Sequence, residues 1–537
     1  MTAKKILLCI ALTLMLLPAS AKKLSVKALR ELAARGTPSV TDQSANRNAL
    51  EESVIRYVQT LDGKLSVEGY VTGSAKYPYH ANNELPHQHS FFEGSQGVAM
   101  ATAWLMNKDG KCGVRLIFKN EKQCQKLVTF SFSEINLKGT RLIQEGRMVT
   151  VMDLTDANIV FSEPCDPSYV PVREKTIGQL TDDDLFTFVR LKDCEFLIKN
   201  GAFINVLEEY MMRSVSGRNM GWNHTDGWGR LIVDGKGDRV FMHMNTKFIN
   251  RRVGGGIPQG RGTIEGILVD TYLPRWGHLS CYGIRPITDS SIQFEWQGEP
   301  GYKTLAAWDW NRPSQGLISA EYGAGMLACE APGEIGRTFD TDNPAILKKG
   351  EAVKDLAGIG GRVDNGAMQI KARACDWWDW EADRARGLMV ICSTAGKSGK
   401  EAFVAFTANA GNGKPEGSEW YPSWWTVSWS TDGKNWTRST DADINLRALP
   451  YNYYGRPLSE PDGEKYVMCA ESAVGYQECL FRLPASVLGQ RRLFVRIHPS
   501  RKIAASKGYM HRDIWALRPD CTDTCYVNFG EIIVGYR

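Results

Sequence analysis

Trp425-Thr-Val-Ser-Trp-Ser-Thr-Asp-Gly-Lys-Asn-Trp-Thr437 carries the clearest fold signal in the chain. Its first half alternates as a strand with one buried face does, and its middle predicts a tight turn, because glycine takes a positive φ without steric cost. The segment therefore predicts a β-hairpin within a β-sandwich. The alternation places Trp425, Val427 and Trp429 on one face and Thr426, Ser428 and Ser430 on the other, with the turn at Asp432-Gly433.

Short apolar stretches separated by turn residues recur throughout the second half of the chain. This spacing is typical of two antiparallel sheets packed face to face. We therefore expect a jelly-roll β-sandwich over residues 296–537. The stretches are 388–391, 402–406, 465–468, 493–497 and 529–536.

The first half contains an internal echo. Ser66-Val-Glu-Gly-Tyr-Val-Thr-Gly73 is similar to Thr263-Ile-Glu-Gly-Ile-Leu-Val-Asp270, and each glycine predicts a bulge or sharp bend. Both segments have neighbouring strand-like stretches. Strand length and spacing predict two small five-stranded barrels, over residues 61–165 and 166–295.

These residues carry a family resemblance. The run from Leu29 through Gly73, together with 262–266 and 282–292, resembles the domain of unknown function 5689, found in exported Bacteroidetes proteins. Over about residues 24–295 it implies OB-like barrels and no catalytic residue, since the family has no established chemistry. The segment 427–437 is similar to one in galactose-binding-like jelly rolls, which are often carbohydrate-binding or adhesive. The predicted fold is mainly β: two OB-like barrels followed by a C-terminal jelly-roll β-sandwich.

The N-terminus predicts export. Lys4 and Lys5 precede an apolar run over 6–17, and Ala19-Ser-Ala21 is a small-residue cleavage site, so residues 1–21 are expected to be a signal peptide. Cys9 is a poor lipid-attachment site, although many relatives are lipid-anchored. The mature chain is expected to be soluble, periplasmic or extracellular, without a transmembrane segment. Residues 22–60 predict a short amphipathic helix and a linker.

Length, charge and cysteine content limit the number of domains and the classes of partner that the protein can have. A chain of 537 residues is longer than one hydrophobic core usually supports, so several domains are expected. Its 65 basic and 60 acidic side chains are interspersed along the sequence, which argues against a nucleic acid partner. The cysteines are compatible with disulfides in an exported protein or with buried free thiols. The candidate pairs are Cys112–Cys124, Cys469–Cys479 and Cys521–Cys525.

Half of the 16 tryptophans lie within residues 377–436, and three of them fall in Asp376-Trp-Trp-Asp-Trp-Glu381. Neighbours on a strand point to opposite faces, so at least one of these three is expected to be exposed or to line a loop pocket. Aromatic rings beside carboxylates suit a sugar; alternatively, the rings plug the end of the sandwich. The candidate ligand-binding residues are Trp377, Trp378, Trp380, Asp376, Asp379, Trp420, Tyr421 and Tyr453.

Other chemistry has weaker support. The acidic residues of 376–383 could form a glycosidase pair or a calcium site, and His80, Glu84, His87 and His89 could bind a metal. No nucleophile elbow, metalloprotease pair or phosphate loop is present. We therefore expect no catalytic residue, metal or cofactor. The predicted function is a non-catalytic binding protein for a glycan or cell-envelope component; the alternatives are a secreted polysaccharide hydrolase and a purely structural envelope protein.

Overall fold

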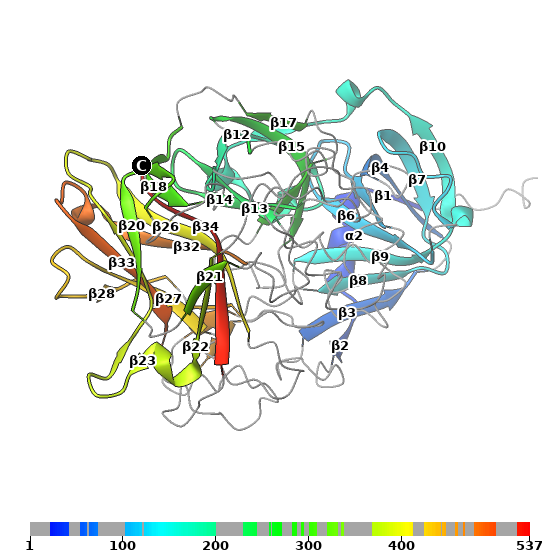
Figure 1. Cartoon of the computed structure of the whole chain (residues 1–537). Helices are drawn as coiled ribbons and strands as arrows, with labels where there is room; N and C mark the ends of the chain where they lie inside the picture. Colours follow the sequence, from blue (N-terminus) through cyan, green and yellow to red (C-terminus); the bar gives the residue numbers. More distant parts are fainter. Residues whose placement is uncertain are drawn as a thin grey trace, which may run out of the picture.

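Figure 1 shows the computed structural model of the chain, whose described residues form mainly β-strands and one α-helix. The mainly β class predicted from the sequence is confirmed. The structure describes residues 22–41, 54–61, 64–73, 102–120, 123–145, 147–199, 229–243, 257–258, 260–270, 282–286, 291–294, 300–308, 319–330, 334–337, 368–411, 424–441, 443–446, 457–459, 465–467, 477–500 and 524–537.

The first barrel, barrel 1, has the strand order of an OB fold. β4, β5 and β6 are antiparallel neighbours, β6 runs parallel to β9, and β9 pairs with β8. β7 pairs with β4 at one end of this strand order, and the next strand in the chain, β8, pairs with β9 at the other end. Residues 131–145 therefore connect the first and last strands of the barrel. The strands are β4 (Leu65–Gly73), β5 (Thr102–Met106), β6 (Gly113–Phe118), β7 (Ser131–Asn136), β8 (Arg141–Glu145) and β9 (Met148–Leu154).

The N-terminal elements belong to barrel 1. Helix α2 (Val26–Ala33) begins at Ser25, whose hydroxyl accepts the Ala28 N–H at 3.1 Å, and it buries its apolar side in the barrel core. Residues 22–60, expected to be a helix and a linker, thus also supply strands. β1 (Lys22–Leu24) pairs with β4, β3 (Val54–Thr60) pairs with β8, and β2 (Thr37–Thr41) pairs with β3. The edge strand β10 (Ile159–Pro164) pairs with β7.

Barrel 2 repeats the same order and is closed by hydrogen bonds. β12, β13 and β14 are antiparallel neighbours, β14 runs parallel to β16, and β15 pairs with both β16 and β12. Its strands are β11 (Arg173–Lys175), β12 (Phe188–Phe196), β13 (Gly229–Asp234), β14 (Arg239–His243), β15 (Gly262–Asp270), β16 (Tyr282–Arg285) and β17 (Ile292–Phe294).

The Glu-Gly echo does not mark equivalent strands. By pairing order, β4 is the first strand of barrel 1, whereas β15 is the fourth strand of barrel 2. The two glycines nevertheless share a physical cause. A Cβ on Gly69 would lie 2.3 Å from the Met106 carbonyl oxygen, and one on Gly266 would lie 2.3 Å from that of Arg285. The pattern therefore marks a close approach of neighbouring backbones.

The C-terminal sandwich has two sheets, whose inner faces enclose the largest core. The docked sheet contains β18 (Lys303–Trp308), β19 (Tyr322–Gly323), β21 (Glu334–Arg337), β22 (Met368–Arg373), β26 (Glu401–Gly411), β32 (Gln477–Pro484) and β34 (Thr524–Tyr536). The outer sheet contains β20 (Gly325–Cys329), β25 (Leu388–Cys392), β27 (Trp424–Ser430), β28 (Thr437–Arg438), β29 (Asp443–Asn445), β30 (Pro457–Ser459), β31 (Lys465–Val467) and β33 (Leu493–Pro499).

The hairpin expected at 425–437 is present as β27 and β28, with Gly433 at φ 74°. Its loop is longer than a two-residue turn, because Trp429 already pairs with Thr437. The Asp432 carboxylate holds the loop by accepting the backbone N–H groups of Lys434 and Asn435, each at 2.8 Å. These bonds lower the pKa of Asp432.

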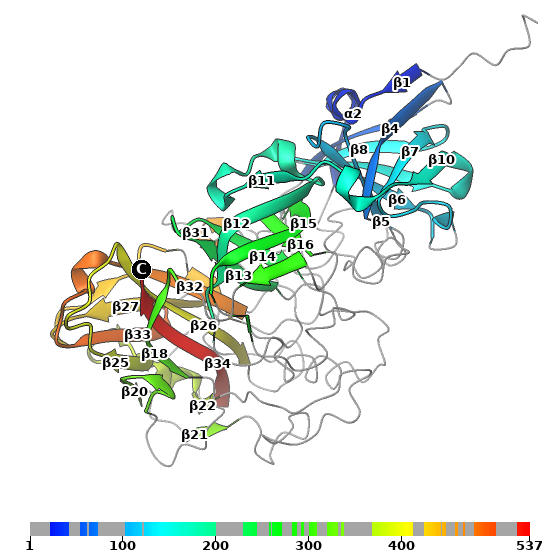
Figure 2. The same cartoon turned by 90° about the horizontal axis from the view of Figure 1, so that it is seen from above.

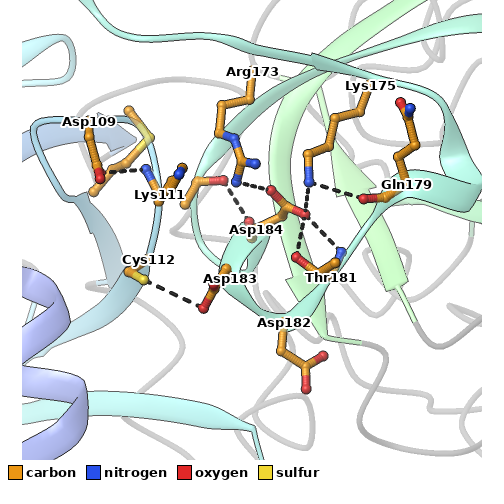
Figure 3. A network of polar contacts seen from close by, with 12 residues as sticks. Asp109, Lys111, Cys112, Arg173, Lys175, Gln179, Thr181, Asp182, Asp183 and Asp184 are labelled. Atoms are coloured by element: carbon orange, nitrogen blue, oxygen red, sulfur yellow. Dashed lines mark hydrogen bonds and ion pairs between the residues drawn. The ribbon is translucent and has the colours of Figure 1, made fainter.

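Barrel 2 lies between barrel 1 and the sandwich (Figures 1 and 2). At the barrel 1 junction, Arg173 and Lys175 converge on the buried carboxylate of Asp184, as Figure 3 shows. The same turn reaches barrel 1, where the Cys112 N–H donates to the Asp183 carbonyl at 2.7 Å. Arg147 of barrel 1 donates to the Asp182 carboxylate at 2.8 Å. The turn 181–184 thus fastens the two barrels together.

Candidate functional site

The face of an OB barrel formed by its second and third strands is the usual place for a ligand. In barrel 2 these strands are β13 and β14. Their outward side chains pack against the docked sheet of the sandwich and are buried there. This seam contains Leu231, Val233 and Phe241 from barrel 2 and Ala307, Phe403, Ala405, Leu480 and Ile533 from the sandwich.

Part of the matching face of barrel 1 is also covered. Trp104 and Met106 on β5 point outward and are buried against Phe188 and Ile267 of barrel 2. Both barrels therefore use their second-strand surface for a domain contact.

The predicted site residues lie at one end of the sandwich, around η11 (Ala374–Trp377), β23 (Trp378–Asp379) and β24 (Arg384–Ala385). β23 and β24 pair as a short hairpin, with Trp378 opposite Ala385. Figure 1 shows β23 at the opposite end of the sandwich from the C-terminus. We call residues 376–386 the aromatic hairpin.

Trp377 is a core residue and presents no surface to a ligand, which corrects its place among the candidates. Its side chain is fully buried, and its ring meets Trp425 edge-on with centroids 5.1 Å apart. The physical reason is the 3-10 turn, which ends at Trp377 and directs this ring inward before the strand begins.

Trp378 and Trp380 are half-buried and pack against the edge of the sandwich core. The indole N–H of Trp378 donates to the Asp383 carboxylate at 3.1 Å, and that of Trp380 donates to the Cys375 carbonyl at 2.9 Å. Both rings are thus held in one orientation while part of each remains accessible. The expectation that these tryptophans cannot all face the core agrees with this arrangement.

The two predicted carboxylates are paired with arginines. Arg373 donates two hydrogen bonds of 2.8 Å to the buried Asp376. Asp379 accepts the Ala382 N–H at 3.1 Å and lies 3.4 Å from Arg386 and 3.6 Å from Arg384. The backbone hydrogen bond, followed by the two arginines, lowers the pKa of Asp379. A glycosidase acid needs a raised pKa, so Asp379 is unsuited to that role.

Several sequence-based expectations lie outside the described residues: Trp420, Tyr421, Tyr453, the histidine loop 77–89 and the signal peptide. In the part of the chain that is described, no group of three or more metal-ligating side chains occurs. Cys112 is a free thiol, so the pair Cys112–Cys124 is not formed. Cys469 and Cys521, which belong to the other two candidate pairs, lie outside the described residues. Among the described helices, none is long and apolar enough to span a membrane.

Sequence reasoning missed the arginines of the site. Arg373, Arg384 and Arg386 lie within a few positions of the carboxylates that they neutralise, but only the turn and the hairpin bring them into contact. The sequence signal that could have revealed them was that they lie close to the four acidic residues within 376–383.

No family model matches the chain, so the resemblance to the domain of unknown function 5689 remains a prediction. No curated protein matches it either. Among solved structures, the K1 cleaved adhesin domain of Lys-gingipain from Porphyromonas gingivalis is 13% identical, with 40% of this chain and 99% of that chain covered and a TM-score of 0.17.

The K3 domain of the same protein is 9% identical, with 43% of this chain and 97% of that chain covered and a TM-score of 0.19. An endo-β-1,4-glucuronan lyase from Trichoderma reesei is 11% identical, with coverages of 44% and 94% and a TM-score of 0.20. TM-scores this low do not establish a shared fold, so these likenesses carry no argument about function.

Proposed function

We propose that this chain is an exported, non-catalytic binding protein whose C-terminal sandwich recognises a glycan or another cell-envelope component through the aromatic hairpin. One observation carries the proposal: Trp378 and Trp380 are partly accessible while their indole N–H groups are fixed by hydrogen bonds. Rings held in place lose little side-chain entropy when a ligand stacks on them.

The surroundings of the two rings favour a sugar. Arg373 and Arg384 are more than half exposed, and Glu381 is exposed beside them. Guanidinium groups donate hydrogen bonds to sugar hydroxyls, and carboxylates accept hydrogen bonds from sugar hydroxyls. The C–H face of a sugar ring stacks on an indole ring. The arginine-paired carboxylates argue against the hydrolase alternative.

Calorimetric titration with a panel of neutral and acidic polysaccharides tests the proposal. The Trp378→Ala/Trp380→Ala variant is expected to lose about ten-fold or more in affinity, as interface tryptophans commonly do. Trp429→Ala is the matched control, since Trp429 is also half-buried against the core but lies on β27. Absence of heat for every polysaccharide, with unchanged tryptophan fluorescence, would refute glycan binding.

Export is the second part of the proposal. The protein recovered outside the cytoplasm is expected to begin at Lys22, which N-terminal sequencing measures. Recovery of the chain in the cytoplasm with Met1 retained would contradict it.

A structural role in the envelope is the second candidate. The complete burial of Trp377 and the packing of Trp378 and Trp380 on the core favour it. In that case the Trp378→Ala/Trp380→Ala variant would lose stability without losing affinity for any polysaccharide. Melting temperature and titration, measured on the same variant, separate the two functions.

A further inference from the structure

Barrel 1 carries a row of aromatic rings that neither the barrel fold nor the proposed hairpin site explains. Tyr70 on β4, Phe132 on β7 and Phe161 on β10 lie side by side on three neighbouring strands. The ring centroids of Tyr70 and Phe132 are 5.4 Å apart, and those of Phe132 and Phe161 are 6.1 Å apart. All three side chains are half-buried. We call them the aromatic row.

The row faces away from the barrel core. On β4, the neighbouring residue Val71 points into that core, and so Tyr70 points outward. Only the Tyr70 end of the row touches the contact with barrel 2; Phe132 and Phe161 lie beyond it. In the part of the chain that the structure describes, the buried contact between the two barrels thus includes the second-strand face of barrel 1 but not Phe132 or Phe161.

A line of ion pairs lies beside the row. Lys108 and Lys23 contact Glu68 at 2.5 and 3.5 Å, and Lys23 contacts Glu134 at 2.7 Å. The Ser66 hydroxyl donates to Glu134 at 2.9 Å. The Lys108 hydrogen bond, followed by the attraction of Lys108 and Lys23, lowers the pKa of Glu68. We call Lys23, Glu68, Lys108 and Glu134 the ionic line; two ammonium groups and two carboxylates give it no net charge.

We propose that the aromatic row and the ionic line form a second glycan-binding surface, on barrel 1, that takes uncharged polysaccharides. Sugar rings would stack along the row, and their hydroxyls would bond to the ammonium and carboxylate groups beside it. Nucleic acids and acidic polysaccharides fit poorly, because a polyanion needs a positive groove and would meet Glu68 and Glu134 here.

Lys108 partly covers the row in the free protein. Its ammonium lies 4.9 Å from the Phe132 centroid, and its side chain is 56% exposed. An exposed cation–π contact is weak, so a ligand displaces Lys108 from the ring at little cost. Once it leaves the ring, the Lys108 ammonium is still available to donate to a sugar hydroxyl beside the row.

The test uses the full chain with Trp378→Ala/Trp380→Ala, so that the aromatic hairpin does not contribute. Affinity electrophoresis is run in gels containing mixed-linkage β-glucan, galactomannan or dextran, with polygalacturonate as the charged comparison. At least one neutral polysaccharide is expected to retard this variant. Adding Phe132→Leu or Phe161→Leu, which keep apolar bulk but lose the planar ring, is expected to weaken retardation about three- to ten-fold.

Tyr169→Leu is the matched control, since Tyr169 is a 72% exposed aromatic outside the row. Melting temperatures of all variants show whether a loss of binding follows from unfolding. The proposal is overturned if no neutral polysaccharide retards the hairpin variant, if only polygalacturonate does, or if Tyr169→Leu matches the row variants. If a neutral polysaccharide retards the parent protein but not the Trp378→Ala/Trp380→Ala variant, the aromatic hairpin binds glycans and the aromatic row does not.

Discussion

The outward faces of the two sheets of the sandwich differ in polarity. The docked sheet presents Phe403, Ala405 and Ile533 to barrel 2, and all three are buried in the seam. Several outward side chains of the outer sheet are polar and pair with one another. There, Arg496 binds Glu330 at 2.6 and 2.8 Å and stacks on Trp436, 3.7 Å from the ring centroid.

The difference is already present in the strand sequences. β26 contains Ala402-Phe-Val-Ala-Phe406, an uninterrupted apolar run whose side chains alternate between the sandwich core and the seam. β27 contains Trp425-Thr-Val-Ser-Trp429, in which only alternate residues are apolar. A strand covered on both faces needs apolar residues throughout, whereas a strand with one polar face alternates. The run in β26 therefore signals domain docking as well as a strand.

The buried ion pair in the docked region should give the largest effect. Lys199 binds Glu195, and its ammonium also donates to the Tyr302 carbonyl at 2.8 Å, with both side chains almost fully buried. Burial lowers the pKa of Lys199, partly offset by Glu195. Lys199→Met leaves a buried carboxylate without its cation and is expected to destabilise the protein by about 3–5 kcal/mol in denaturant titration.

The exposed pair Lys192–Glu174 is the control for that experiment. Its side chains are 49% and 51% exposed, so Lys192→Met is expected to cost less than about 1 kcal/mol. Equal losses for the two variants would show that the seam does not desolvate Lys199. A loss confined to a separate early transition would show that barrel 2 and the sandwich unfold independently.

Isoleucines on the two outward faces provide the next comparison. Ile533 is buried in the seam, whereas Ile391 is half-buried on the outer sheet. Ile533→Ala is expected to lower the unfolding free energy by about 2–4 kcal/mol, and Ile391→Ala by about 1 kcal/mol. Thermal and denaturant unfolding measure both. A reversed order would mean that the outer face, rather than the docked face, is the covered one.

Local pattern accounts for most of the fold that could be predicted from the sequence. Stretches such as 388–391 and 493–497 match β25 and β33 closely, because each is a short apolar run bounded by turn residues. The closure of barrel 2 and the covering of β13 and β14 depend on residues far apart in the chain, so no local pattern reveals them.

The candidate site was partly predictable for the same reason. Alternation predicts that Trp377, Trp378 and Trp380 cannot all face the core, and in the structure Trp377 is fully buried whereas Trp378 and Trp380 are half-buried. It could not tell which ring is buried, because the 3-10 turn at Ala374–Trp377 interrupts the strand. The aromatic row was missed because Tyr70, Phe132 and Phe161 are distant in sequence and meet only through strand pairing.

A smaller effect than those of Lys199 and Ile533 is expected from a buried histidine of the outer sheet, His498. His498 Nδ1 lies 2.6 Å from the Pro499 carbonyl, which can only accept, so Nδ1 carries the hydrogen and Nε2 accepts from Ser428 at 2.8 Å. Burial is the main cause that lowers the pKa of His498 to about 4, with Arg496 and Arg438 as smaller causes.

The unfolded chain protonates this group near its ordinary pKa of about 6.5, so between that value and about 4 the unfolded state binds more protons. Stability therefore falls as the pH falls, by about 1–2 kcal/mol between about pH 7 and pH 5. His498→Gln should remove this part of the pH dependence, whereas Ser428→Ala should retain it, as urea titrations at the two pH values measure. An unchanged pH dependence in His498→Gln would mean that the polar face of the outer sheet admits water, unlike the seam.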